Sequence, residues 1–205
     1  MRIKQIEKLC KRDKTIVLFD DTRGEHPAQW IGDGKAAYPV EGLPELDRDA
    51  IFTIFSVPDN KQDKWAYHRL NTLPDILCFE DKMEGEAEAK EIGELQLVRN
   101  GRTLKAVRTS RGIIFYDTIY MEPISDLFNL SIFERSTKEG ASYIAVKTGF
   151  LLRALIMPYD IIKDDFVDEL TSLAEEAVRT LSRKKAAQCR IAIDWETGEI
   201  IGDDL

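Results

Sequence analysis

Two pairs of adjacent carboxylates stand where strands are expected to end. Asp20-Asp21 follow an apolar stretch at residues 15–19, and Glu80-Asp81 follow another at residues 76–79. Carboxylates that converge at strand ends can hold Mg²⁺ and support cleavage of a phosphodiester bond. Acidic residues also end strands simply because they stay solvated, and this interpretation is favoured. A metal-dependent phosphodiesterase or nuclease is therefore kept as an alternative, with no catalytic or metal-binding residue assigned.

The other reactive side chains lack the spacing that catalysis requires. Neither His26 nor His68 accompanies a sequence signature for a Ser or Cys triad. The Gly-Asp-Gly-Lys segment at residues 32–35 lacks the spacing of a phosphate loop. The three cysteines form no C-x-x-C pair and indicate free thiols in a reducing compartment. We predict no cofactor and favour a binding role over an enzymatic one.

A basic segment stands out against the acidic composition. Residues 95–116 contain no acidic residue, and Asn100-Gly101 favours a type I′ turn between two strands. Such a ribbon can contact nucleic-acid phosphates. The same cations can also protect an exposed hairpin from pairing with another sheet, so both interpretations stay open. The candidate nucleic-acid-binding residues are Arg99, Arg102, Lys105, Arg108 and Arg111.

The N-terminal segment supplies a second group of cations. Ile3, Ile6, Leu9 and Cys10 recur at helical spacing, which predicts an amphipathic helix. If this helix and the hairpin share one surface, they can form a groove that follows a phosphate backbone. Affinity for nucleic acid would then fall steeply with salt. The cations of this segment are Arg2, Lys4, Lys8, Lys11, Arg12 and Lys14.

The composition limits the classes of function. The chain has 205 residues, is 43% hydrophobic and carries a formal net charge of −8, as is typical of an acidic globular protein. A negative chain disfavours non-specific contact with nucleic acid or anionic lipid, except through a local basic patch. No apolar run approaches the ~20 residues of a membrane span, and the N-terminus does not resemble a signal peptide. We expect a cytoplasmic protein with no membrane partner.

The order of predicted elements indicates an α+β fold with mainly antiparallel sheets and a long C-terminal helix. Short helices are expected after Asp47 and across residues 123–128, and the longest helix begins at Asp164. A hairpin with its turn at Thr197-Gly198 closes the chain. Besides the strands already described, strands are expected at residues 29–31, 36–40, 113–116, 131–134, 142–147 and 150–156.

The acidic segment at residues 82–93 is expected to be a mobile connection, because its Glu, Ala and Gly content suits a linker better than a strand. It would separate an N-terminal α+β half, residues 1–81, from a C-terminal β-meander and long helix, residues 94–205. One compact unit is the alternative to these two halves. Leu18-Phe19-Asp20 and Ile132-Phe133-Glu134 match at an offset of 132 − 18 = 114 residues. An internal duplication and chance both explain this match.

Several short segments carry a resemblance: Phe115-Tyr116-Asp117, Tyr143-Ile144-Ala145, Gly149-Phe150 and Met157-Pro158. Together they resemble an uncharacterised protein family carried by bacterial prophages. That resemblance implies an accessory or structural phage component and no particular activity. The order of elements across residues 113–156 also resembles a half-domain of DNA sliding clamps, although the acidic residues of its helix depart from the clamp pattern.

These observations predict a non-enzymatic, phage-related binding or assembly protein that contacts DNA through the basic hairpin. The expected partners are nucleic acid, other phage proteins or further copies of the same chain. A structural homo-oligomer and the metal-dependent phosphodiesterase are the alternatives.

Overall fold

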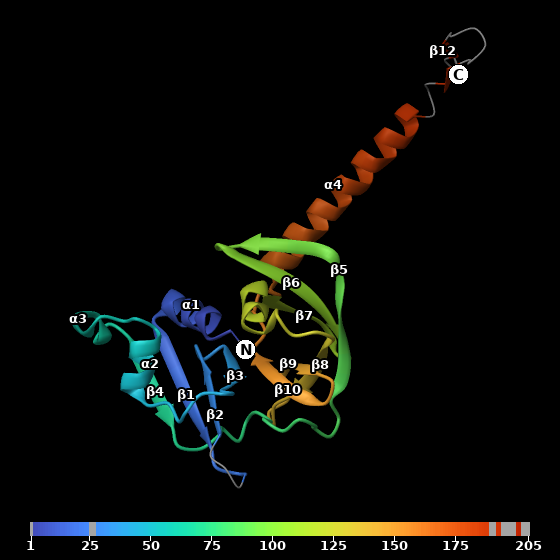
Figure 1. Cartoon of the computed structure of the whole chain (residues 1–205). Coiled ribbons are helices and arrows are strands. Elements are labelled where there is room, and N and C mark those ends of the chain that lie inside the picture. Colours follow the sequence, from blue (N-terminus) through green and yellow to red (C-terminus); the bar gives the residue numbers. More distant parts are fainter. Residues whose placement is uncertain (1, 25–27, 189–191, 194–199, 202–205) are drawn as a thin grey trace. The chain divides into compact units, whose positions relative to one another are not determined.

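The computed structural model describes residues 2–24, 28–188, 192–193 and 200–201, and the chain divides into two compact units, Met1–Asp160 and Ile161–Leu205. The first unit contains one ten-stranded sheet with short helices (Figure 1). Its helices are α1 (Ile3–Asp13), α2 (Arg48–Ile54), α3 (Asp59–Gln62) and the 3₁₀ helix η1 (Thr118–Ile124). Its strands are β1 (Thr15–Asp21), β2 (Ala28–Gly32), β3 (Ala36–Pro39), β4 (Ala66–Leu70), β5 (Ala87–Arg99), β6 (Arg102–Thr109), β7 (Gly112–Asp117), β8 (Leu130–Ser136), β9 (Ser142–Thr148) and β10 (Leu151–Ile156).

The strands follow the order β4-β1-β2-β3-β10-β9-β8-β5-β6-β7, and only β4 and β1 pair in parallel. β5 links two regions of the sheet, because its first residues pair with β8 and its later residues with β6. Beyond β10, the backbone N–H of Tyr159 donates to the carbonyl of Phe115 in β7 at 2.7 Å. The sheet therefore curls back on itself. The predicted α+β fold with a mainly antiparallel sheet is confirmed.

Two antiparallel meanders, β1-β2-β3 and β8-β9-β10, meet edge to edge. Ala37 of β3 pairs with Leu155 of β10, and each meander follows a helix, α1 in one case and η1 in the other. Residues from both predicted halves thus lie in the single unit Met1–Asp160. A duplication predicts this repeated order of elements, and the duplication itself stays a prediction.

Local sequence explains several of these elements. α1 buries the apolar stripe that its helical spacing predicted. The Asp47 side chain caps α2 by accepting the backbone N–H of Ala50 at 2.8 Å. Asn100 and Gly101 have φ angles of 52° and 72°, the left-handed values that a type I′ turn requires. The predicted first helix, the helix after Asp47 and the hairpin are confirmed.

Both faces of the sheet bury apolar side chains, because alternate residues of a strand point to opposite sides. α1, α2 and η1 contribute Leu9, Phe52 and Tyr120 to the core on one face. The segment at residues 71–86 contributes to the other core, where Phe79 packs edge-on against Trp30 with ring centroids 5.1 Å apart. This segment is therefore part of the folded structure.

A buried cation fastens the segment at residues 71–86 to the sheet. The side chain of Arg135 in β8 is 0% exposed and donates from Nε and Nη2 to Glu86 Oε2 at 2.9 and 2.7 Å. It also donates to the carbonyls of Cys78 and Asp81, at 2.8 and 3.2 Å. Lys147 pairs with the same Glu86 carboxylate. The buried charge thus has the partners that desolvation demands.

This cluster predicts acid sensitivity. Burial would raise the pKa of Glu86, but hydrogen bonds from Lys147 and Arg135 outweigh burial and lower that pKa below its ordinary value of 4.5. Because the pKa of Glu86 is lower in the folded state than in the unfolded state, its ionised carboxylate stabilises the folded protein above about pH 4.5. This stabilisation is lost as the pH falls through the pKa of Glu86 in the folded state. We expect Glu86→Gln to flatten the loss of unfolding free energy below about pH 4.5, measured by urea unfolding between about pH 7 and 3. Glu84→Gln, at an exposed neighbour, should leave the slope unchanged, and equal slopes for both variants would contradict the prediction.

Three secondary-structure expectations are wrong. Residues 76–79 form no strand, because side chains take up the backbone hydrogen bonds of Cys78. Its N–H donates to the Tyr143 hydroxyl, and its carbonyl accepts from Arg135. Residues 87–93 belong to β5 rather than to a mobile connection, since pairing with both neighbouring strands outweighs weak strand propensity. The helix expected across residues 123–128 is instead the 3₁₀ helix η1, which ends at Ile124.

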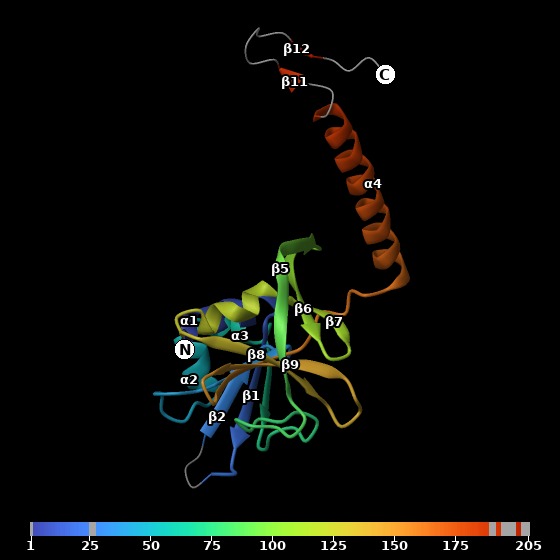
Figure 2. The ribbon, with the colours of Figure 1, turned by 90° about the vertical axis from the view of Figure 1, so that its right-hand side faces the viewer.

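The second unit contains α4 (Asp164–Gln188), an uninterrupted helix of 25 residues (Figure 2). The predicted long C-terminal helix is confirmed. β11 (Ala192–Ile193) pairs antiparallel with β12 (Ile200–Ile201), and the turn predicted at Thr197-Gly198 lies outside the described residues. Across the part of the chain that the structure describes, every helix is too short or too polar to cross a membrane.

Candidate functional site

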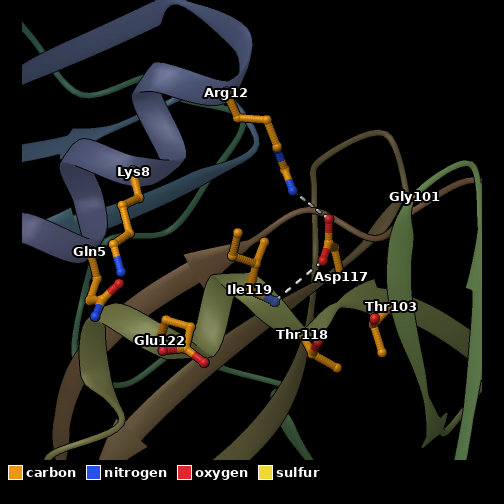
Figure 3. Close-up of a pocket in the computed structure, with 9 residues that line it drawn as sticks. All are labelled: Gln5, Lys8, Arg12, Gly101, Thr103, Asp117, Thr118, Ile119 and Glu122. Carbon is orange, nitrogen blue, oxygen red and sulfur yellow. Dashed lines mark hydrogen bonds and ion pairs between the residues drawn. The ribbon is translucent and has the colours of Figure 1, made fainter.

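A groove in the first unit lies between α1, η1 and the turn of the β5–β6 hairpin (Figure 3). Its volume is about 450 Å³. α1 lines it with Gln5, Lys8 and Arg12, and the hairpin lines it with Gly101 and Thr103. The structure therefore brings together the first helix and the basic hairpin, the two segments that the sequence predicted could flank a phosphate-binding groove.

The helical wall of the groove is a row of polar side chains. Gln5, Lys8 and Arg12 stand three and four residues apart, so they project from one face of α1. The opposite face of α1, including Ile6 and Leu9, is buried in the core. Burial of the apolar stripe thus orients this polar row towards the groove, where Lys8 is exposed.

The side of the groove next to β7 carries a buried carboxylate. Asp117, whose side chain is 3% exposed, accepts from Arg12 Nη1 at 2.8 Å and from Arg102 Nη1 at 3.1 Å, both at Oδ2. Its Oδ1 accepts the backbone N–H of Ile119 at 3.3 Å and caps η1. One carboxylate therefore holds a guanidinium from each wall.

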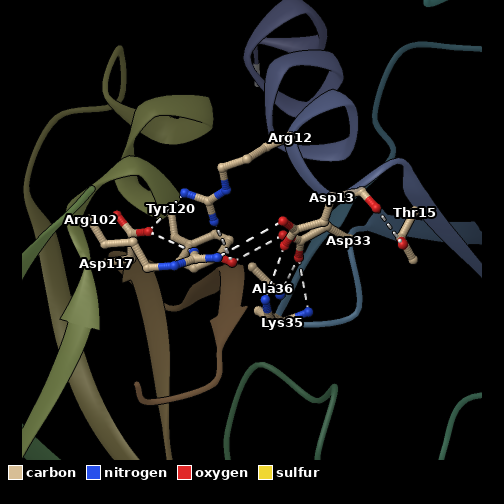
Figure 4. A network of polar contacts seen from close by, with 9 residues as sticks. All are labelled: Arg12, Asp13, Thr15, Asp33, Lys35, Ala36, Arg102, Asp117 and Tyr120. Atoms are coloured by element: carbon tan, nitrogen blue, oxygen red, sulfur yellow. Dashed lines mark hydrogen bonds and ion pairs between the residues drawn. The ribbon is translucent and has the colours of Figure 1, made fainter. Parts of the chain in front are cut away.

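The network continues under the groove through a tyrosine (Figure 4). The Tyr120 hydroxyl accepts from Arg12 at 2.9 Å and donates to Asp33 at 3.0 Å. The other oxygen of Asp33 accepts the backbone N–H groups of Lys35 and Ala36, at 2.9 and 3.0 Å. Burial and the nearby Asp33 carboxylate raise the pKa of Tyr120 well above its ordinary value. The tyrosine stays protonated at neutral pH and acts as a structural link.

The five candidate cations of the hairpin do not form one surface stripe. Arg102 pairs with Asp117, Lys105 pairs with Glu91, and Arg111 donates to the carbonyl of Gly140 at 2.6 Å. Arg99 also has an interaction partner. Arg108 is exposed. Nucleic-acid binding by these residues stays a prediction, and intramolecular acceptors already occupy Arg102, Lys105 and Arg111.

The sequence offered no signal for the anionic side of the site. Asp117 and Glu122 line the groove, although neither belongs to the basic segment at residues 95–116 or to a pattern that predicts a binding site. Asp117 is 105 residues from Arg12 in the chain. A pairing at that separation leaves no periodic pattern in the sequence.

The carboxylates considered as metal ligands each have another partner. Asp20 accepts from Arg69 at 2.8 Å, while Asp21 and Glu80 both pair with Arg23. Asp81 accepts the backbone N–H of Leu152 at 2.8 Å. Among the described residues, no three His, Cys, Asp or Glu side chains are grouped so that they could hold a metal ion. The phosphodiesterase alternative therefore lacks the convergent carboxylates that it requires.

The environment of Cys10 makes it a poor nucleophile. Cys10 is buried and its thiol donates to the carbonyl of Gly32 at 3.5 Å. Burial, and then the charge of Asp33, raise the pKa of Cys10 well above its ordinary value, which keeps the thiol protonated and unreactive. His68 lies on β4, whereas His26 and Cys189 lie outside the described residues.

Comparison with known protein families, curated proteins and solved structures finds no match to this chain. The resemblance to a prophage-borne family, the partnership with other phage proteins and the likeness to sliding clamps therefore stay predictions from the sequence. The assignment of function rests on the geometry of the groove.

Proposed function

We propose that the first unit is a non-enzymatic binding module whose groove receives the phosphate backbone of a nucleic acid. The observation that carries this proposal is the position of the groove between α1 and the hairpin turn, with Lys8 exposed on its helical wall. Lys4 and Lys14 are exposed on the same N-terminal segment. A local group of cations can attract a polyanion even though the chain as a whole carries −8.

The expected binding is weak and depends on salt. Non-specific protein–nucleic acid complexes have Kd values of about 10⁻⁶ to 10⁻⁴ M, and each neutralised phosphate adds about −0.9 to the log–log salt slope. The groove volume of about 450 Å³ suits a few backbone contacts rather than a long binding track. We therefore expect little discrimination between base sequences.

Reversal of one charge in the groove tests the proposal. Lys8→Glu should weaken binding of a fluorescent DNA duplex about tenfold at ~50 mM salt and reduce the salt slope by about 1. Fluorescence anisotropy over a salt series measures both quantities. Lys138→Glu makes the same charge change at an exposed position in the β8–β9 turn and should have little effect. Equal weakening by both variants, or no binding by the unaltered chain at ~50 mM salt, would contradict a specific role for the groove.

A further inference from the structure

α4 carries an apolar face that is exposed along most of its length. The side chains of Leu173, Val178 and Leu181 are 66%, 64% and 53% exposed. Ala174 and Ala177 lie between them on the same side of the helix. At 25 residues, α4 is about 37 Å long. A long helix gains most of its stability by packing an apolar face, so this face indicates a partner.

The charges of α4 form two opposite blocks. Every charged residue at positions 164–176 is acidic, a charge of −6, and every charged residue at positions 177–188 is basic, a charge of +4. The acidic block comprises Asp164, Asp165, Asp168, Glu169, Glu175 and Glu176, and the basic block comprises Arg179, Arg183, Lys184 and Lys185. Pairs within the helix, such as Arg179 with Glu176, are exposed and contribute little, so they do not prevent a rearrangement.

We infer that α4 pairs with α4 of a second copy of the chain in an antiparallel arrangement. A parallel pair would place each block beside a block of the same sign, whereas an antiparallel pair places −6 beside +4 at both ends. Paired helices lie about 8–10 Å apart, close to one Debye length at physiological salt. The charge blocks therefore still interact across the pair and select its orientation.

The apolar face also determines the register of the pair. It runs from Val167 to Leu181, so its midpoint is (167 + 181)/2 = 174. An antiparallel pair centred on Ala174 sets Val167 of each copy against Leu181 of the other. Ala174 of each copy then lies opposite Ala174 of the other at the centre, where a small side chain allows close approach, and larger aliphatic side chains lie on both sides of this point.

The full-length chain tests whether this face mediates association. Sedimentation equilibrium should show a monomer–dimer equilibrium, and Leu181→Asp should raise the dimer Kd by at least about tenfold, because a buried unpaired carboxylate is unfavourable. Ser172 lies nine positions away, on the opposite side of the helix, so Ser172→Asp is the matched control. A monomeric unaltered chain at about 100 µM, even at low salt, overturns the inference. So does a Leu181→Asp variant that associates as well as its control.

The orientation is tested by reversing whole charge blocks. Changing the four basic residues to Glu converts +4 to −4. The facing blocks of an antiparallel pair then change from attraction to repulsion, whereas the facing blocks of a parallel pair repel both before and after the change. Changing Asp164, Asp165, Asp168 and Glu169 to Lys converts −6 to −6 + 8 = +2. Each variant alone should be monomeric, which tests the orientation. An equimolar mixture should form a one-to-one heterodimer, which tests that the charge blocks of the two helices face one another. Recovery of association on mixing would show that both variants keep a helix that can pair, so a mixture that stays monomeric, or either variant dimerising alone, overturns the inference.

Discussion

Replacement of Arg135 by methionine is expected to lower the free energy of unfolding by about 3–5 kcal/mol. Methionine fills much of the same space but removes the donors to Glu86 and to the carbonyls of Cys78 and Asp81. The Arg135 side chain is 0% exposed, so water cannot replace those hydrogen bonds without local opening. Lys147 still pairs with Glu86 and offsets part of the loss. Urea unfolding followed by tryptophan fluorescence measures the change.

Lys11→Met is the matched control for this substitution. Lys11 forms an exposed ion pair with Glu7 one helical turn away, and removal of such a pair changes stability by less than about 0.5 kcal/mol. If Arg135→Met were as mild as Lys11→Met, the buried guanidinium would not be what holds the segment at residues 71–86 to the sheet.

Asp117→Asn is expected to lower the free energy of unfolding and to raise the affinity for a polyanion. The asparagine side chain can place its NH₂ group where Asp117 Oδ2 accepts hydrogen bonds from Arg12 and Arg102. Both guanidinium groups would then face a hydrogen-bond donor instead of an acceptor. We expect a loss of about 2–4 kcal/mol in unfolding free energy. The same change frees two guanidinium groups beside the groove, and affinity for a DNA duplex should rise several-fold at ~50 mM salt.

Urea unfolding and fluorescence anisotropy on the same preparation separate these two effects. Glu139→Gln makes the same charge change in the exposed β8–β9 turn and should leave both quantities close to those of the unaltered chain. Loss of stability together with loss of binding would show that the groove needs the ion pair intact, and would contradict a binding role for the freed guanidinium groups.

The sequence predicted much of the local structure because the signals are local. The apolar spacing of α1, the cap at Asp47 and the Asn100-Gly101 turn all lie within a few residues of the structure they produce. Prediction failed at residues 76–79 and 87–93, where distant partners decide the backbone conformation. The backbone N–H of Cys78 donates a hydrogen bond to the hydroxyl of a tyrosine 65 residues away. Residues 87–93 form part of β5 because they pair with β8 and β6.

For the site, the sequence by itself determined which segments are rich in cations and that α1 must turn its apolar stripe inwards. Only the tertiary structure decided which cations are already neutralised. Asp117 reaches Arg12 across 105 positions and Arg102 across 15, whereas Lys8 stays exposed in the groove. Helical periodicity and turn preferences depend on residues that are close together in the chain. The electrostatic energy of a charged side chain depends instead on the charges that are close to it in space, and these are determined only by the tertiary fold.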